Sequence, residues 1–167
     1  MADEIRFTDN RAQIKSGLQH AIDTAMKESL LVLEAEIKSN AKVISGGLRN
    51  SINYQIKGTG DKTVGFIGSP LEYAKYVEYG TGEKAEKGAG RKGYWVFVKG
   101  STGMGASRGK SYTLQEAKQI MAIMRKDGKE AYYTNGIKPQ KFFRGAFENK
   151  KDAVKAILAK RLGSEFK

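Results

Sequence analysis

The sequence contains no cysteine and a single histidine, His20. Disulfide bonds and thiol chemistry are therefore excluded, and a metal site or catalytic triad built on histidines is not expected. No run of about 18 apolar residues occurs, so no membrane-spanning helix is expected. The N-terminal residues include acidic side chains and lack the apolar stretch of a signal peptide. A cytosolic origin fits these absences.

Positive charge dominates, since 30 Lys and Arg stand against 18 Asp and Glu, a formal net charge of +12. The excess is concentrated in residues 83–110 and 138–167. A basic surface suits nucleic acid, an anionic membrane or an acidic protein face. Ordinary solvated loops and helix faces would produce the same pattern, so both interpretations stay open. The candidate contact residues are Lys84, Lys87, Arg91, Lys92, Arg108 and Lys110.

Hydrophobic periodicity predicts a long helix near the N-terminus, capped by Thr8 or Asp9 and ending at about Asn40. The apolar residues of this segment recur every three or four positions, which places them on one helical face. They are Ile14, Leu18, Ile22, Met26, Leu30, Leu33 and Ile37. The alternating residues 52–57 and the segment 63–68 then predict a β-hairpin around a Gly-Thr-Gly-Asp turn.

A short aromatic helix is predicted over residues 73–79. Ser69, Pro70 and Glu72 resemble a capping box with proline at the first helical position, and Gly80 is a natural end. The glycine-rich residues 80–93 predict a mobile loop, and residues 99–111 a second one.

The remaining elements are two further strands and two helices. Residues 94–98 are dense in β-formers, and residues 131–134 resemble a strand that ends at an Asn-Gly turn. Between them, Thr113 and Glu116 form a capping box for a helix over about 114–126. A last helix is predicted after Pro139. Residues 99–130 separate these two strands in the sequence.

These elements predict an α+β fold, because a hairpin followed by a helix argues against a parallel, doubly wound sheet. We expect one antiparallel sheet of about four strands, with the long N-terminal helix and the C-terminal helix on one face. The length of 167 residues predicts a single domain over 1–167, loop-rich in 83–130.

No motif supports enzymatic chemistry or a bound cofactor. Residues 103–111, GMGASRGKS, resemble a phosphate-binding loop, but the spacing from either glycine to the Gly-Lys-Ser triplet is wrong by one residue. Glu72 and Glu78 lie six positions apart and face different sides of their helix, so they do not form a catalytic pair. Glu78 is instead a candidate for accepting backbone N–H bonds, with a solvated helix residue as the equal alternative.

Large aromatic side chains cluster around the short helix and the later strands. They could pack the core, anchor a subunit interface, or stack on bases, and the core interpretation comes first. The interface candidates are Tyr73, Tyr76, Glu78, Tyr79, Trp95, Phe142 and Phe143.

Residues 45–52, SGGLRNSI, form a turn before the first predicted strand, and residues 73–82, YAKYVEYGTG, span the aromatic helix and its end. Residues 138–148, KPQKFFRGAFE, lead into the last helix. In this order, the three segments resemble motifs of the tail-completion, or neck, proteins of long-tailed phages, although Lys141 and Gly145 stand where prolines are common. In that family, strands like residues 94–98 and 131–134 are often joined by a short turn, so the resemblance implies that residues 99–130 are a loop-plus-helix insertion within a hairpin.

The resemblance implies a structural virion protein at the head–tail junction, made in the host cytoplasm, with no catalytic role. The implied partners are further copies in a ring, expected to be sixfold, the head connector, and the tail-terminator or tail-tube proteins. DNA in the neck channel is a further expected contact, whereas a membrane or a small-molecule substrate is not expected. The alternative from the residues alone is a basic nucleic-acid-binding protein.

Overall fold

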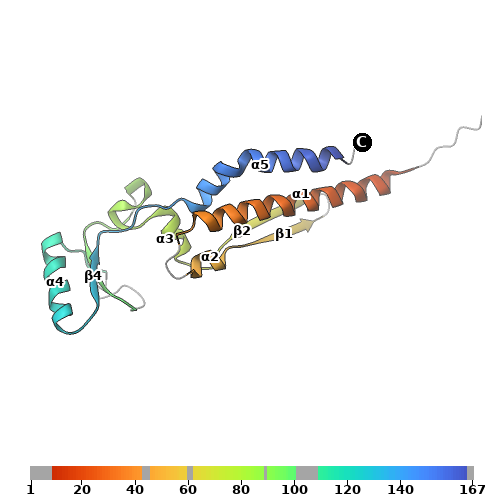
Figure 1. Ribbon diagram of the computed structural model, residues 1–167. Coiled ribbons are helices and arrows are strands. Elements are labelled where there is room, and N and C mark those ends of the chain that lie inside the picture. The colour runs from red at the N-terminus through yellow and green to blue at the C-terminus, as the bar shows by residue number, and fades with distance from the viewer. Residues whose placement is uncertain (1–8, 43–45, 60–61, 89, 101–108, 165–167) are drawn as a thin grey trace, which may run out of the picture. The chain divides into compact units, whose positions relative to one another are not determined.

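The computed structural model describes residues 9–42, 46–59, 62–88, 90–100 and 109–164. The chain forms two compact units (Figure 1). Unit 1 combines Met1–Pro70 with Phe142–Lys167, and unit 2 is the continuous segment Leu71–Lys141. A single domain over residues 1–167 stays a prediction.

Unit 1 is built on the long helix α1 (Arg11–Asn40), which ends where the sequence predicts. The N-cap residue is Asn10, which makes no side-chain capping bond, so the predicted cap at Asp9 is wrong. The Asp9 carboxylate instead accepts the backbone N–H of Arg11 at 3.1 Å, and Thr8 lies outside the described residues. Burial follows only part of the predicted apolar face, because Leu30, Leu33 and Ile37 are buried whereas Ile14 is exposed.

The strands β1 (Asn53–Thr59) and β2 (Lys62–Gly68) form the predicted antiparallel hairpin, which follows the short helix α2 (Gly47–Ser51). This hairpin packs against α1. A side chain at Gly65 would lie 2.7 Å from the Met26 sulfur and 2.8 Å from a Leu30 methyl group. Glycine at this position therefore lets the helix approach the strand closely.

The last helix, α5 (Phe142–Ser164), runs along α1 in unit 1 (Figure 1). Phe142 and Ala146 are fully buried at its start. Further along, Lys150 pairs with Glu36 at 3.3 Å, and the Nε atom of Arg161 donates to Glu28 at 2.9 Å. Apolar packing at one end and ion pairs along the length thus join the two helices.

Unit 2 contains the predicted hairpin with an inserted helix. The strands β3 (Trp95–Val98) and β4 (Ala131–Thr134) are antiparallel, although residues 99–130 separate them in sequence. The helix α4 (Leu114–Lys126) packs against this pair around a core of Val96, Ala117 and Ala131. The predicted capping box is confirmed, because Thr113 Oγ1 accepts the N–H of Glu116 at 3.3 Å and the Glu116 carboxylate accepts that of Thr113 at 2.8 Å.

The mixed α+β class and the four strands are confirmed, but the prediction of one sheet is wrong. The strands form two separate two-stranded sheets, one in each unit. The reason is that each hairpin has its own covering helix: α1 packs on β1–β2, and α4 packs on β3–β4. The helices α1 and α5 therefore accompany the first sheet only.

The start of the aromatic helix also differs from the prediction. The helix α3 (Ala74–Tyr79) begins after Tyr73, which makes no side-chain capping bond. The hydroxyl of Ser69 instead lies 2.7 Å from that of Ser51 in unit 1. At the other end the prediction holds, because Gly80 terminates the helix with a positive φ of 76°.

Candidate interaction surfaces

Three tyrosines of unit 2 form an exposed row on and just before α3. Tyr73, Tyr76 and Tyr79 are 44%, 50% and 53% exposed. Their spacing of three residues places them on one side of the helix. The core interpretation is therefore wrong for these three side chains, because the buried positions of the helix belong to Ala74 and Glu78.

The backbone of α3 is held by the chain that leads out of unit 2. The N–H of Gln140 donates to the Val77 carbonyl at 2.9 Å, and the N–H of Lys141 donates to the Glu78 carbonyl at 3.3 Å. Glu78 itself is buried, so the solvated alternative for this carboxylate is wrong. These bonds satisfy carbonyls that a helix end leaves open, and they fix the tyrosine row in place.

The segment after α3 is tied down, contrary to the prediction of a mobile loop over residues 80–93. It contains the short 3-10 turns η1 (Gly82–Lys84) and η2 (Glu86–Gly88). The N–H of Thr81 donates to the Ile137 carbonyl at 3.0 Å, and that of Glu83 donates to the Asn135 carbonyl at 2.9 Å. The described part of this loop is thus hydrogen-bonded to the chain that follows β4.

Glu83 closes this loop, and no motif in the sequence singles it out. Its carboxylate accepts the backbone N–H of Gly93 at 2.9 Å and the amide of Asn135 at 3.1 Å. These bonds, the Gly93 bond first, hold the pKa of Glu83 below its ordinary value, and nearby Lys92 and Lys84 add to the effect. The carboxylate therefore acts as a clamp in its charged form.

Close backbone contacts explain why the loop is rich in glycine. A side-chain carbon at Gly90 would lie 2.0 Å from the Gly82 carbonyl oxygen, and one at Gly136 would lie 1.9 Å from that of Thr81. No side chain fits at such distances. The glycines that suggested flexibility instead allow segments of the backbone to lie in direct contact.

Arg91, a predicted basic contact residue, and Trp95, a predicted interface residue, are in contact with each other. The guanidinium of Arg91 lies over the Trp95 ring, 5.0 Å from its centroid, and its Nε donates to Ser111 Oγ at 3.1 Å. Ser111 in turn donates to the Lys92 carbonyl at 2.6 Å. Arg91 is therefore engaged within unit 2, and Trp95 is half-buried beneath it.

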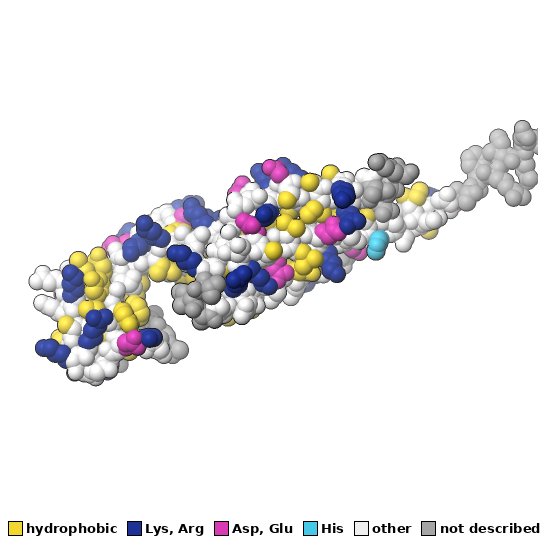
Figure 2. Space-filling model, in the orientation of Figure 1, with side chains coloured by type: hydrophobic (Ala, Val, Ile, Leu, Met, Phe, Trp, Pro, Cys, Tyr) yellow, Lys and Arg dark blue, Asp and Glu magenta, His cyan; other side chains and the backbone are white. Residues whose placement is uncertain are grey.

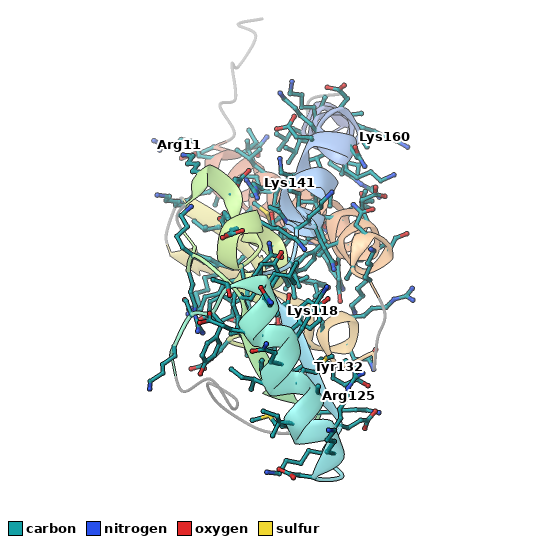
Figure 3. The ribbon with its side chains drawn as sticks, turned by 90° about the vertical axis from the view of Figure 1, so that its left-hand side faces the viewer. Arg11, Lys118, Arg125, Tyr132, Lys141 and Lys160 are labelled. Carbon is teal, nitrogen blue, oxygen red and sulfur yellow. The ribbon has the colours of Figure 1, made fainter. Side chains whose placement is uncertain are left out.

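An aromatic pair lies on the face of the β3–β4 sheet opposite the face that α4 covers. The rings of Phe97 and Tyr132 are stacked, with centroids 5.7 Å apart, and both are partly exposed. Figure 3 shows Arg125 near Tyr132, and the Arg125 guanidinium lies 5.4 Å from the centroid of the Tyr132 ring. Rings with adjacent guanidinium groups suit either protein contacts or base stacking.

The other predicted site residues lie in different places. Phe142 is fully buried in unit 1, with its ring centroid 4.6 Å from that of Phe143, so Phe142 belongs to the core. On unit 2, Figure 2 shows Lys and Arg side chains beside hydrophobic ones, with few acidic side chains on that face. Arg108 and most of the segment that resembled a phosphate loop lie outside the described residues. Of the predicted basic contact residues, Lys84, Lys87, Lys92 and Lys110 are exposed.

Metal and membrane sites are not found in the described part of the chain. No group of three His, Cys, Asp or Glu side chains there could hold a metal ion. Of the described helices, none is long and apolar enough to cross a membrane.

A scan against protein families gave a match for residues 6–80, to the model described as "Bacteriophage HK97-gp10, putative tail-component". The matched span includes the two earlier motif segments up to Gly80, while residues 138–148 lie outside it. Searches of curated proteins and of solved structures gave no match. The match confirms the resemblance that the motifs indicated: residues 6–80 are similar to a phage tail-component family, which indicates a structural role in the virion.

Proposed function

We propose that this protein is a structural virion protein at the head–tail junction, which completes the tail and joins it to the head connector. The collar of a phage-tail-like particle is the equivalent position. The exposed tyrosine row of α3 is the observation that carries the proposal, because it lies at the end of the span that matches the tail-component family.

The tyrosines suit an assembly interface for a physical reason. Each offers a large, amphipathic surface with few rotatable bonds, so little conformational entropy is lost on binding. The helix that carries them is already fixed by the backbone bonds from Gln140 and Lys141. In this proposal the row contacts a neighbouring copy in a ring, expected to be sixfold, while other surfaces meet the head connector and the tail-terminator or tail-tube proteins.

The basic surface supports a secondary contact with DNA in the neck channel. Exposed Lys84, Lys87 and Lys92 could neutralise phosphates without reading sequence. The alternative function, a free nucleic-acid-binding protein, is favoured by the stacked pair Phe97 and Tyr132 beside Arg125. It predicts salt-dependent DNA binding by the isolated chain, which fluorescence anisotropy with labelled single- and double-stranded DNA measures.

The decisive experiment disrupts the reading frame in the phage or prophage that encodes it and images the induced lysate by negative-stain electron microscopy. A junction protein is required to join finished parts, so we expect filled heads and separate tails, with normal particles restored by the wild-type gene in trans. Normal particles without complementation would reject the proposal. Empty heads or missing tails would place the protein at another step of assembly.

Light scattering on a sizing column, at low and high salt, separates the two functions for the purified chain. A ring mass that survives high salt supports the assembly function. A monomer that binds DNA with an affinity falling steeply with salt supports the alternative.

A further inference from the structure

Unit 1 contains an apolar groove that the proposed function does not use. The groove has a volume of about 520 Å³ and is lined by α1, β2 and α5. Leu30 of α1 and Phe147, Val154 and Leu158 of α5 supply apolar surface. All of its lining residues belong to unit 1, so its shape does not depend on unit 2.

One side of the groove follows an unpaired strand edge. All five consecutive residues 63–67 line it, although alternate residues of a strand point to opposite faces of a sheet. The groove therefore runs along the edge of β2. Among the described strands β2 pairs with β1 alone, so every second residue of β2 directs its N–H and C=O away from the sheet. Such an edge is a template for another strand.

A buried hydroxyl in the groove also lacks a partner. Ser29 of α1 is 4% exposed, and its Oγ atom has no hydrogen-bond partner among the described residues. A buried polar atom without a partner costs free energy, which a bound group with a donor or acceptor would recover. Ser29 thus indicates an occupant with polar atoms, such as a polypeptide backbone, in an otherwise apolar groove.

The charges beside the groove favour an acidic occupant. Lys62 precedes the lining residues of β2, and Lys151 lies one turn from both Phe147 and Val154 on α5. Both lysines are exposed. Among the acidic residues nearby, Asp23 accepts a bond from Thr63 at 3.2 Å and Asp152 lies 3.9 Å from Lys155, while Glu148, three positions before Lys151, is exposed.

We propose that this groove binds an extended segment of another protein, which adds to the free edge of β2 as a third strand. Its backbone pairs with β2, and one set of alternate side chains, mostly apolar, packs against α1 and α5. Acidic residues flank these positions and face Lys62 and Lys151. The inference does not depend on where in the virion the protein lies.

The test selects ligands for the purified full-length protein from a displayed library of seven random residues, which matches the seven residues of β2. We expect enriched peptides with apolar residues at alternate positions and Asp or Glu beside them. In hydrogen-exchange mass spectrometry, a synthetic copy of an enriched peptide is expected to slow exchange in residues 62–68. Apolar residues at helical spacing, or no change in that exchange, would overturn the proposal.

A matched pair of variants shows whether the groove is the binding site. Phe147 and Leu31 are both 46% exposed, but only Phe147 lines the groove. Phe147→Glu is therefore expected to weaken peptide binding about tenfold or more, since it places a charge in an apolar contact, while Leu31→Glu leaves binding unchanged. Circular dichroism confirms that both variants fold. Equal binding to both variants would reject the site.

Charge reversal tests the acidic part of the inference. Lys151→Glu is expected to weaken the enriched acidic peptides, whereas Lys42→Glu, an exposed lysine that does not flank the groove, is not. Failure to enrich any peptide would overturn the proposal. Self-association that Phe147→Glu abolishes, without a selected peptide, would assign the groove to a second copy of the chain instead.

Discussion

The carboxylate of Glu83 accepts the backbone N–H of Gly93, ten positions further along the chain. Its second oxygen accepts the side-chain amide of Asn135, just after β4. One side chain thus connects the two ends of the loop to each other and to the segment that follows β4.

Replacing Glu83 by glutamine tests the clamp. The Glu83→Gln side chain has one carbonyl oxygen where the carboxylate has two, and it loses the charge that strengthens both bonds. We expect faster amide exchange across residues 80–93, measured by hydrogen-exchange mass spectrometry at neutral pH. Glu72→Gln, an exposed glutamate of the same unit, is the control and is expected to change nothing. Unchanged exchange in Glu83→Gln would contradict the clamp.

The same residue predicts a pH dependence. Because folding lowers the pKa of Glu83, the unfolded state binds its proton more readily, and the clamp stabilises the fold above the unfolded pKa, about 4.3 for an ordinary glutamate. This stability is lost as the pH falls through the lowered folded value. The difference in melting temperature between wild type and Glu83→Gln is therefore expected to shrink on acidification below that point. A difference independent of pH would assign the effect to packing instead.

Gly90→Ala is expected to destabilise unit 2 by more than about 2 kcal/mol, because the new methyl group would lie far inside contact distance of the Gly82 carbonyl. The single tryptophan, Trp95, lies beside Gly82, so its fluorescence during urea unfolding reports on this region. Gly68→Ala is the matched control, since nothing lies within 4 Å of its added carbon. A similar cost at both positions would refute the steric explanation.

Thr113→Ala removes one half of the capping box at the start of α4. Loss of such a cap costs about 1 kcal/mol of stability. We expect that decrease in urea denaturation, with Thr113→Ser, which keeps the hydroxyl, close to wild type. If the alanine and serine variants are equally unstable, the hydroxyl bond is not the cause.

Tyr76→Ser is expected to leave folding intact and to impair assembly, because this side chain is exposed in the middle of the tyrosine row. Infectious titre after complementation of the disrupted gene measures assembly, and the melting temperature measures folding. Ile123→Ser provides the comparison, since Ile123 is also an exposed apolar residue of unit 2 but lies on α4. Full complementation by Tyr76→Ser would remove this tyrosine from the interface.

Local patterns predicted the elements well, and each success has a short-range cause. The end of α1 at Asn40, the β1–β2 hairpin, and the capping box of Thr113 and Glu116 all depend on residues within a few positions of one another. The pairing of β3 with β4 across an insertion is the exception, because it was expected from the family resemblance, in which such strands are joined by a short turn. The family match to residues 6–80 agrees with the motifs read there.

The errors arose where distant segments decide the outcome. Ser69 was predicted to cap α3, but its hydroxyl lies beside that of Ser51. Ser51 precedes β1, whereas Ser69 follows β2, so the whole β1–β2 hairpin separates the two residues in sequence. Glycine content predicted mobility in residues 80–93, yet Gly90 and Gly136 are required for close backbone contact. A glycine-rich composition is expected both for a flexible loop and for a place where two segments of the chain lie in backbone contact. Only the position of the partner segment distinguishes these two cases.

The discontinuity of unit 1 has a consequence for the order of folding during synthesis. Unit 2 is one continuous stretch, so all of its contacts are available once Lys141 has left the ribosome. The helix α1 is translated before unit 2, and its partner α5 is translated after it. The nascent chain therefore carries the apolar side of α1 uncovered by α5 while the whole of unit 2 is made, and a chaperone that shields this helix would raise the yield of native protein.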